Sequence, residues 1–197
     1  MIFTKNIPNA LTISRFFISL LLIVIAINGH ATNLFVILFI LGALTDFLDG
    51  FIARKLKVMT VNGAVLDGYA DIALYFSALL SAWFLFPQII RKHLFSIAIL
   101  IAIQFVSWAF SYAKFRRLTS YHTYAAKTWG MMLFVSFVSL FAFANDFLLI
   151  SMFVIAAVSI SEDIVITGIL PCWKSEVKHF LMAIRIRDKY LKKRALS

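Results

Sequence analysis

Six long apolar runs, separated by short polar segments, make up most of the chain. Each run is close to the roughly 20 residues that a transmembrane helix needs. The runs are continuous, whereas the strands of a transmembrane β-barrel alternate between apolar and polar positions. The pattern therefore predicts an all-α membrane protein with six transmembrane helices, at residues 11–28, 34–53, 64–86, 93–112, 128–144 and 147–170.

The composition supports a membrane protein of one domain. Hydrophobic residues make up 62% of the 197-residue chain and charged residues 14%, whereas charged residues make up roughly 25% of soluble domains. No linker-like stretch separates the six runs, so we predict a single membrane domain over residues 1–197. The chain has one cysteine, Cys172, which rules out an internal disulfide.

The net charge of +10 is distributed unevenly among the segments between the runs. Of the 19 lysines and arginines, 17 fall on one side of the predicted topology, and the two exceptions are Arg91 and Lys92. The positive-inside rule places that side, with both termini, in the cytoplasm. We therefore expect a multi-pass protein of a bacterial cytoplasmic membrane that contacts the lipid bilayer. We expect no nucleic-acid partner, because the basic residues lie in short segments between apolar runs.

The basic C-terminal segment, residues 174–194, predicts one further element. Its apolar and basic residues are arranged as in an amphipathic helix that lies on lipid headgroups. A solvated basic tail is the alternative.

Four of the nine acidic residues lie in or beside the second and third runs, where they form two pairs. Asp46 and Asp49 are three residues apart, and Asp67 and Asp71 are four apart, so on helices each pair shares one face. The connection between these runs is short, so the helices should be antiparallel neighbours whose pairs can face each other. A carboxylate inside a membrane costs about 2.5–3.5 kcal/mol, and neighbouring carboxylates repel one another. Hard divalent ions such as Mg²⁺, Mn²⁺ or Ca²⁺ prefer oxygen ligands and would keep the carboxylates ionised. Four carboxylates could hold two such ions, an arrangement that serves phosphoryl displacement, and we expect Mg²⁺ or Mn²⁺.

Three further residues near the aspartates fit a phosphate-containing substrate. Gly50 and Gly63 would let a phosphate or a nucleotide approach the backbone, and Arg54 could bind a phosphate. Helix packing or a loop turn is the alternative role of the glycines. For Arg54 the alternative is an ordinary cytoplasmic charge.

The residues of this stretch match a known pattern. The chain resembles the CDP-alcohol phosphatidyltransferases, whose signature D-x2-D-G-x2-A-R-x8-G-x3-D-x3-D it matches at every fixed position and spacing. The chain length and the six-span layout are also similar to that family. The opening NIPNALTISR, residues 6–15, resembles the start of the phosphatidylglycerophosphate synthase and cardiolipin synthase branch. The eight signature residues are Asp46, Asp49, Gly50, Ala53, Arg54, Gly63, Asp67 and Asp71.

The resemblance implies a role for each of these positions. Asp46, Asp49 and Asp67 would ligate two divalent ions, and Asp71 would also contact a metal and act as general base. Gly50, Arg54 and Gly63 would hold the CDP portion of the substrate. The implied reaction transfers a phosphatidyl group from CDP-diacylglycerol to an alcohol and releases CMP. The resemblance leaves a homodimer open.

The acceptor alcohol is less well defined by the sequence. Glycerol 3-phosphate is the first expectation, and phosphatidylglycerol, an inositol phosphate or another polar alcohol are the alternatives. Arg116, Arg117, His122 and Lys127 cluster between the fourth and fifth runs and could bind a phosphate on the acceptor. Ordinary cytoplasmic charges and an interfacial histidine are the alternative interpretation of this cluster.

Two other classes of function compete with the enzyme. A small cation transporter would also carry aspartates inside the membrane, but it would not need the set of Gly50, Ala53, Arg54 and Gly63. A non-catalytic assembly protein of the same fold would not need every signature carboxylate, and all four are present. Release of CMP from CDP-diacylglycerol with Mg²⁺ separates the enzyme from both.

Glu162 and Asp163 lie inside the sixth apolar run, outside the signature. Acidic residues within a membrane segment are functional candidates by default. A salt bridge to Lys127 or Arg15 is the structural explanation that we expect for them.

Overall fold

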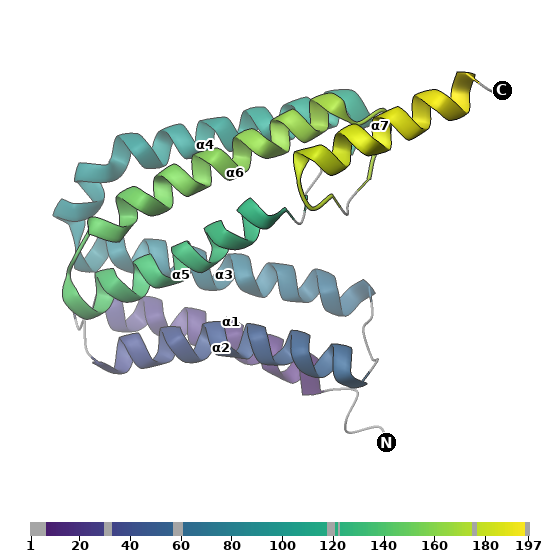
Figure 1. The fold of residues 1–197 in the computed structure, drawn as a ribbon. Coiled ribbons are helices and arrows are strands. Elements are labelled where there is room, and N and C mark those ends of the chain that lie inside the picture. Colours follow the sequence, from purple (N-terminus) through teal and green to yellow (C-terminus); the bar gives the residue numbers. More distant parts are fainter. Residues whose placement is uncertain are drawn as a thin grey trace. The chain divides into compact units, whose positions relative to one another are not determined.

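The computed structural model describes residues 7–29, 33–56, 61–117, 121, 123–174 and 177–195, and the regular elements of this part are all α-helices (Figure 1). The all-helical prediction is confirmed. In chain order the helices are α1 (Ile7–Ile27), α2 (Asn33–Leu56), α3 (Val61–Leu85), α4 (Pro87–Phe115), α5 (Tyr124–Phe143), α6 (Phe147–Ile169) and α7 (Phe180–Ala195).

Three of these helices, α4, α5 and α6, are long and apolar enough to cross a membrane by length and composition. The described apolar stretches of α1, α2 and α3 are shorter, at Leu11–Ile27, Asn33–Thr45 and Tyr69–Leu85. As whole helices, however, α1 to α3 contain 21, 24 and 25 residues. At a rise of 1.5 Å per residue they are about 32–38 Å long, which exceeds the roughly 30 Å of a bilayer core.

Several predicted helix boundaries differ from the structure, and the largest difference is at the start of the fourth helix. The prediction that residues 87–92 form a connection is wrong, because α4 begins at Pro87. Proline suits the first position of a helix, where its missing N–H would have no partner within the helix. The fifth helix begins at Tyr124 rather than at residue 128, because Thr123 caps it: the N–H of Ala126 donates to Thr123 Oγ1 at 3.1 Å.

The chain divides into two compact units, each described here by itself. The first unit consists of Met1–Arg91 and Phe137–Asn145. Within it α1 packs along both α2 and α3. At Gly42 the three helices come so close that an added Cβ would lie 2.9 Å from Leu74 Cδ1 and 3.3 Å from Ile18 Cγ2. A group of aromatic rings packs elsewhere in this unit; it consists of Phe35, Phe39, Tyr75, Phe86, Phe137 and Phe141.

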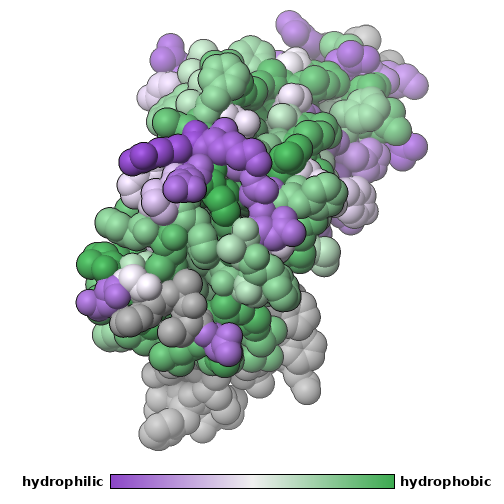
Figure 2. All heavy atoms as spheres, turned by 90° about the vertical axis from the view of Figure 1, so that its left-hand side faces the viewer, coloured by the Kyte–Doolittle hydropathy of each residue, from purple (hydrophilic) through white to green (hydrophobic). Residues whose placement is uncertain are grey.

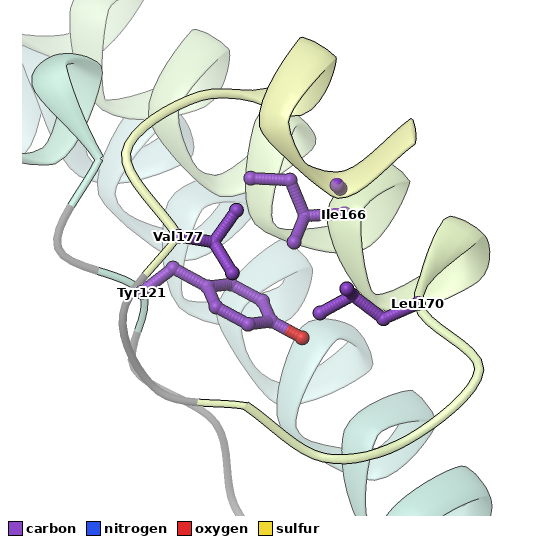
Figure 3. Close-up of a cluster of buried hydrophobic side chains, with 5 residues drawn as sticks. Tyr121, Ile166, Leu170 and Val177 are labelled. Carbon is purple, nitrogen blue, oxygen red and sulfur yellow. The ribbon is translucent and has the colours of Figure 1, made fainter. Parts of the chain in front are cut away.

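The second unit consists of Lys92–Ser136 and Asp146–Ser197, and its core joins α6 to α7 (Figure 3). The Tyr121 hydroxyl forms a hydrogen bond with Thr167 Oγ1 at 3.0 Å. Lys114 Nζ donates to the carbonyl oxygens of Thr167 and Gly168 at 2.9 and 2.7 Å, which satisfies acceptors in the last turn of α6. The core residues are Tyr121, Ile166, Leu170, Val177 and Ala183.

Apolar side chains cover much of the molecular surface, as Figure 2 shows for one face. Large exposed hydrophobic residues occur on every helix from α1 to α6. A soluble protein rarely exposes so much contiguous apolar surface, whereas a membrane protein exposes it to lipid. Examples are Phe17, Leu34, Phe76, Phe95, Phe105, Met131 and Val154.

Candidate active site

Two neighbouring helices in the sequence carry the whole signature. Helix α2 contains Asp46, Asp49, Gly50 and Arg54, and α3 contains Gly63, Asp67 and Asp71. The backbone is helical at every one of these positions. A spacing of three residues in α2 and of four in α3 therefore places each aspartate pair on one face of its helix, as the sequence predicts.

Most of the signature side chains lie outside the described part of the structure. Asp71 is the one signature aspartate whose side chain is described, and the contacts of the others stay predictions. Among the described residues no group of three or more His, Cys, Asp or Glu side chains could hold a metal ion, but three of the four predicted ligands are not among them. The side chains concerned are those of Asp46, Asp49, Ala53, Arg54 and Asp67, and the surroundings of Gly50 and Gly63 are likewise outside.

The donor set fits the metal that the sequence implies. Both helices supply carboxylates only, and the described carboxylate of Asp71 keeps 38% of its side-chain surface exposed. Mg²⁺ and Mn²⁺ prefer oxygen ligands, and Mg²⁺ usually keeps some bound water. A site built from carboxylates therefore suits these ions better than it suits Zn²⁺ or copper.

Asp71 forms an ion pair with a residue from a third helix. Arg15 Nη1, on α1, lies 2.5 Å from Asp71 Oδ1. The side chain of Arg15 is completely buried. Its Nε also donates to Thr45 Oγ1, on α2, at 3.4 Å. One buried cation thus contacts side chains from both signature helices.

Arg15 and Thr45 were not among the site residues predicted from the sequence. A signal for Arg15 was present, since arginines inside membrane segments usually pair with an acid and mark functional positions. Arg15 is also the last residue of the NIPNALTISR motif at residues 6–15. Thr45 carries no comparable signal, because a lone threonine in an apolar run is common in helix interfaces.

The four predicted acceptor residues belong to the second unit or lie outside the described residues. Arg116 follows α4 with a positive φ of 55°, and its N–H donates to the carbonyl of Tyr112 at 2.8 Å. The guanidinium of Arg117 lies over the Trp173 ring, 5.4 Å from its centroid. Lys127 is exposed in the first turn of α5, and His122 lies outside the described residues. Because Asp71 belongs to the first unit, the proximity of this cluster to the carboxylates stays a prediction.

The two acidic residues of α6 have different surroundings in the second unit. Glu162 Oε1 accepts a hydrogen bond from the N–H of Phe180 at 3.2 Å. Asp163 Oδ1 is buried and has no hydrogen-bond partner within the described part of the chain. Within the second unit, the described contacts include no salt bridge from Glu162 or Asp163 to Lys127. Because Arg15 belongs to the first unit, a salt bridge to Arg15 stays a prediction.

Comparison with known proteins finds one family and several relatives. The family model for CDP-alcohol phosphatidyltransferase matches residues 5–173. The relatives described next bear the name CDP-diacylglycerol–glycerol-3-phosphate 3-phosphatidyltransferase. The protein from Aquifex aeolicus is 44% identical over 80 residues, which are 40% of this chain and 44% of the relative. That from Rickettsia typhi is 42% identical over 69 residues, 34% of this chain and 39% of the relative. That from Haemophilus influenzae is 36% identical over 97 residues, 43% of this chain and 51% of the relative.

The matches to these relatives are partial. The chain spans between two fifths and about one half of the length of the relatives named above. No solved structure matches the chain.

Proposed function

Because the chain belongs to the CDP-alcohol phosphatidyltransferase family, whose model matches residues 5–173, we propose that it transfers a phosphatidyl group from CDP-diacylglycerol to glycerol 3-phosphate. The observation that carries the proposal is the helical backbone of α2 and α3, which continues through all eight signature positions. On a helical backbone, spacings of three and four residues put the two aspartates of each pair on the same face, as joint metal binding requires. The names of the relatives support glycerol 3-phosphate as the acceptor.

In the proposed reaction the hydroxyl oxygen of the acceptor attacks the β-phosphorus of CDP-diacylglycerol. The bond between that phosphorus and the bridging oxygen breaks, CMP leaves with that oxygen, and the hydroxyl proton passes to the Asp71 carboxylate. Gly50, Arg54 and Gly63 bind the CDP portion.

The carboxylates of the two signature helices would hold the metal ions. The ligands proposed are Asp46, Asp49, Asp67 and Asp71. When bound, two divalent ions supply positive charge that polarises the pyrophosphate and stabilises the departing CMP. Asp71 would thus combine the roles of ligand and base.

The topology proposed from the charge distribution places this site where the substrate needs it. Six transmembrane helices with cytoplasmic termini put the C-terminal end of α2 and the N-terminal end of α3 on the cytoplasmic side. There the acyl chains of CDP-diacylglycerol can stay in the bilayer while its nucleotide reaches water. This topology makes the protein a multi-pass component of a bacterial cytoplasmic membrane.

Helix α7 has the properties of a helix at the membrane surface. One side packs on the second unit through buried Ala183. The exposed side carries apolar Phe180 and Leu191, together with basic residues such as Arg185 and Lys189. Apolar side chains that enter the headgroup region, flanked by positive charge that attracts anionic lipids, are typical of interfacial helices. We therefore place α7 on the cytoplasmic surface of the bilayer.

The test is an acceptor screen with purified protein in mixed micelles that contain CDP-diacylglycerol and Mg²⁺. We expect release of CMP, fastest with glycerol 3-phosphate, and a product lipid whose headgroup matches the acceptor supplied. Excess EDTA should abolish turnover, because the clustered carboxylates need divalent ions. Faster turnover with phosphatidylglycerol or an inositol phosphate would reassign the acceptor. No CMP release with any alcohol would refute the proposed reaction and favour the cation transporter.

A further inference from the structure

The first observation concerns the burial of Arg15. Its side chain has no exposed surface, although an arginine is rarely buried completely unless it is paired. Its Nη1 lies 2.5 Å from Asp71 Oδ1. These two residues are 56 positions apart in the sequence, so the ion pair depends on the packing of α1 against α3.

The second observation is that the guanidinium of Arg15 is held from two sides. Nη1 is bound to Asp71 and Nε donates to Thr45 Oγ1. The Thr45 hydroxyl in turn donates its proton to the Gly42 carbonyl oxygen at 2.6 Å, so its lone pairs face Arg15. The guanidinium is planar and rigid. Hydrogen bonds from two of its nitrogens to acceptors on different helices therefore fix its orientation. The position of Asp71 Oδ1 is thereby tied to the backbone of α2.

Stability alone does not explain this arrangement. Replacing a buried ion pair by well-packed apolar residues is often neutral or stabilising, because desolvation of the two charges offsets their attraction. In addition, the packing of α1 against α2 and α3 already has an apolar basis, with Leu22, Ala26, Phe39 and Leu74 buried. We therefore expect the ion pair to orient the Asp71 carboxylate more than it stabilises the packing of α1 against α2 and α3.

We propose that Arg15 is a positioning residue that fixes the orientation of the Asp71 carboxylate for proton transfer. The contact at Oδ1 sets the direction of the carboxylate that accepts the hydroxyl proton of the acceptor. Arg15 also places one permanent positive charge beside Asp71, which favours the ionised form of this carboxylate. This inference rests on the proposed function of Asp71 as general base.

The experiment compares Arg15→Gln and Arg15→Lys with the wild-type protein. Turnover is measured by CMP release, and divalent affinity is measured separately by Mn²⁺ titration without lipid substrate. Arg15→Gln removes a positive charge near the metal ligands, so we expect Mn²⁺ to bind as tightly as in the wild type or more tightly. We expect kcat to fall by about 10²-fold, the scale for loss of an oriented general base, with KM for CDP-diacylglycerol unchanged. Arg15→Lys retains the charge but cannot hold Thr45 and Asp71 in one rigid plane, so its kcat should also fall.

A purely structural role would give a different pattern. Turnover, Mn²⁺ affinity and thermal stability would then fall together in Arg15→Gln, and Arg15→Lys would restore all three. Either this pattern or unchanged turnover in Arg15→Gln would overturn the inference. Arg187→Gln is the matched control, because Arg187 is exposed on α7 and pairs with its neighbour Asp188.

A second variant keeps the test independent of the folding of Arg15 variants. Thr45→Val conserves shape and removes the hydroxyl that orients Arg15. We expect a smaller fall in kcat than in Arg15→Gln, with unchanged Mn²⁺ affinity; unchanged kcat in Thr45→Val would contradict the orienting role. If the wild-type protein binds Mn²⁺ but releases no CMP with any acceptor, the proposed function is wrong. If the wild-type protein releases CMP and the Arg15 variants release it equally fast, only the inference about Arg15 is wrong.

Discussion

The guanidinium of Arg15 lies 2.5 Å from the carboxylate of Asp71, and this contact joins α1 to the aspartate that the sequence predicts as the general base. The contact affects how any substitution of Asp71 must be interpreted. Removing the carboxylate would take one negative partner away from a buried, positively charged guanidinium. Breaking a buried ion pair in this way usually costs about 3–5 kcal/mol. Activity and stability therefore have to be measured together.

The first prediction separates the base from the other metal ligands. Asp71→Asn retains size and an oxygen that can accept from Arg15, but it loses basicity. We expect CMP release to fall by about 10²-fold or more, while CDP-diacylglycerol still binds with metal. Asp46→Asn and Asp49→Asn should weaken metal-dependent substrate binding as well. The measurements are CMP release, binding of CDP-diacylglycerol at several Mg²⁺ concentrations, and thermal unfolding.

The control for this series is Asp188→Asn, which makes the same chemical change at an exposed site on α7. It should leave turnover and binding unchanged. If high Mg²⁺ restores normal turnover to Asp71→Asn, the residue is a ligand only. His122 would then be the next candidate for the base.

The helices could be predicted from the sequence, but the contacts between them could not. Apolar runs and charge asymmetry define where the chain meets lipid, and the signature spacing defines which aspartates share a face. Hydropathy does not define helix ends: Pro87–Lys92 is polar enough to suggest a connection, yet Pro87 starts α4. Likewise, the sequence offered Arg15 only as a partner for Glu162 or Asp163 and did not predict its contact with Asp71. That contact depends on helix packing between positions far apart in the chain.

The second prediction concerns the pH dependence of stability at the connection between α5 and α6. Asp146 Oδ2 lies 2.6 Å from Lys92 Nζ and 2.9 Å from His93 Nε2. Hydrogen bonds from Lys92 and then His93 lower the pKa of Asp146 from 3.8 to about 2. Because the folded-state pKa is the lower one, this contribution to stability is fully present above pH 3.8 and is lost as the pH falls through about 2.

Thermal unfolding of the wild type and Asp146→Asn in detergent micelles, from pH 7 to pH 2, tests this. We expect Asp146→Asn to unfold at a lower temperature at pH 7, by a small margin because the Lys92 partner is exposed. The two curves should converge below about pH 4. A difference that persists unchanged at pH 2 would show that Asp146 acts through packing rather than through its charge.

The third prediction tests the close approach of three helices at Gly42. A Cβ there would lie 2.9 Å from Leu74 Cδ1, and Leu74 is buried, so it has little room to move. We expect Gly42→Ala to lower the free energy of unfolding by about 1–3 kcal/mol, the usual cost of overpacking a core. In the control Gly130→Ala nothing lies within 4 Å of the added Cβ, so higher helix propensity should stabilise α5 by up to about 1 kcal/mol. Equal effects of the two substitutions would contradict the close packing.

The fourth prediction tests the topology by cysteine labelling in intact cells. Cys172 is exposed, so the background is Cys172→Ser. We expect a membrane-impermeant maleimide to label Ala31→Cys without permeabilisation, because that segment carries no lysine or arginine. Lys57→Cys should react only after permeabilisation. Both positions lie outside the described residues, and labelling of both from outside would overturn the topology and move the site to the wrong side.

The last prediction separates the structural and the acceptor-binding roles of Arg116. Arg116 and Ala144 both follow a helix with positive φ, at 55° and 51°. Each N–H donates to the carbonyl four residues earlier, Tyr112 and Leu140 respectively, so the two positions end their helices in the same way. Glycine adopts this conformation without the cost of a Cβ, which is roughly 1–2 kcal/mol for other residues. Arg116→Gly and Ala144→Gly should therefore stabilise the protein by similar amounts.

The two variants should differ in activity. If Arg116 binds a phosphate on the acceptor, Arg116→Gly raises KM for glycerol 3-phosphate and leaves KM for CDP-diacylglycerol unchanged, because a charge-assisted contact to the acceptor is lost. Ala144→Gly relieves the same backbone cost without removing a charge, so both KM values should stay at the wild-type level. The measurements are thermal unfolding and CMP release at varied acceptor concentration. An unchanged KM for glycerol 3-phosphate in Arg116→Gly would remove Arg116 from the acceptor site and leave it as an ordinary cytoplasmic charge that ends α4.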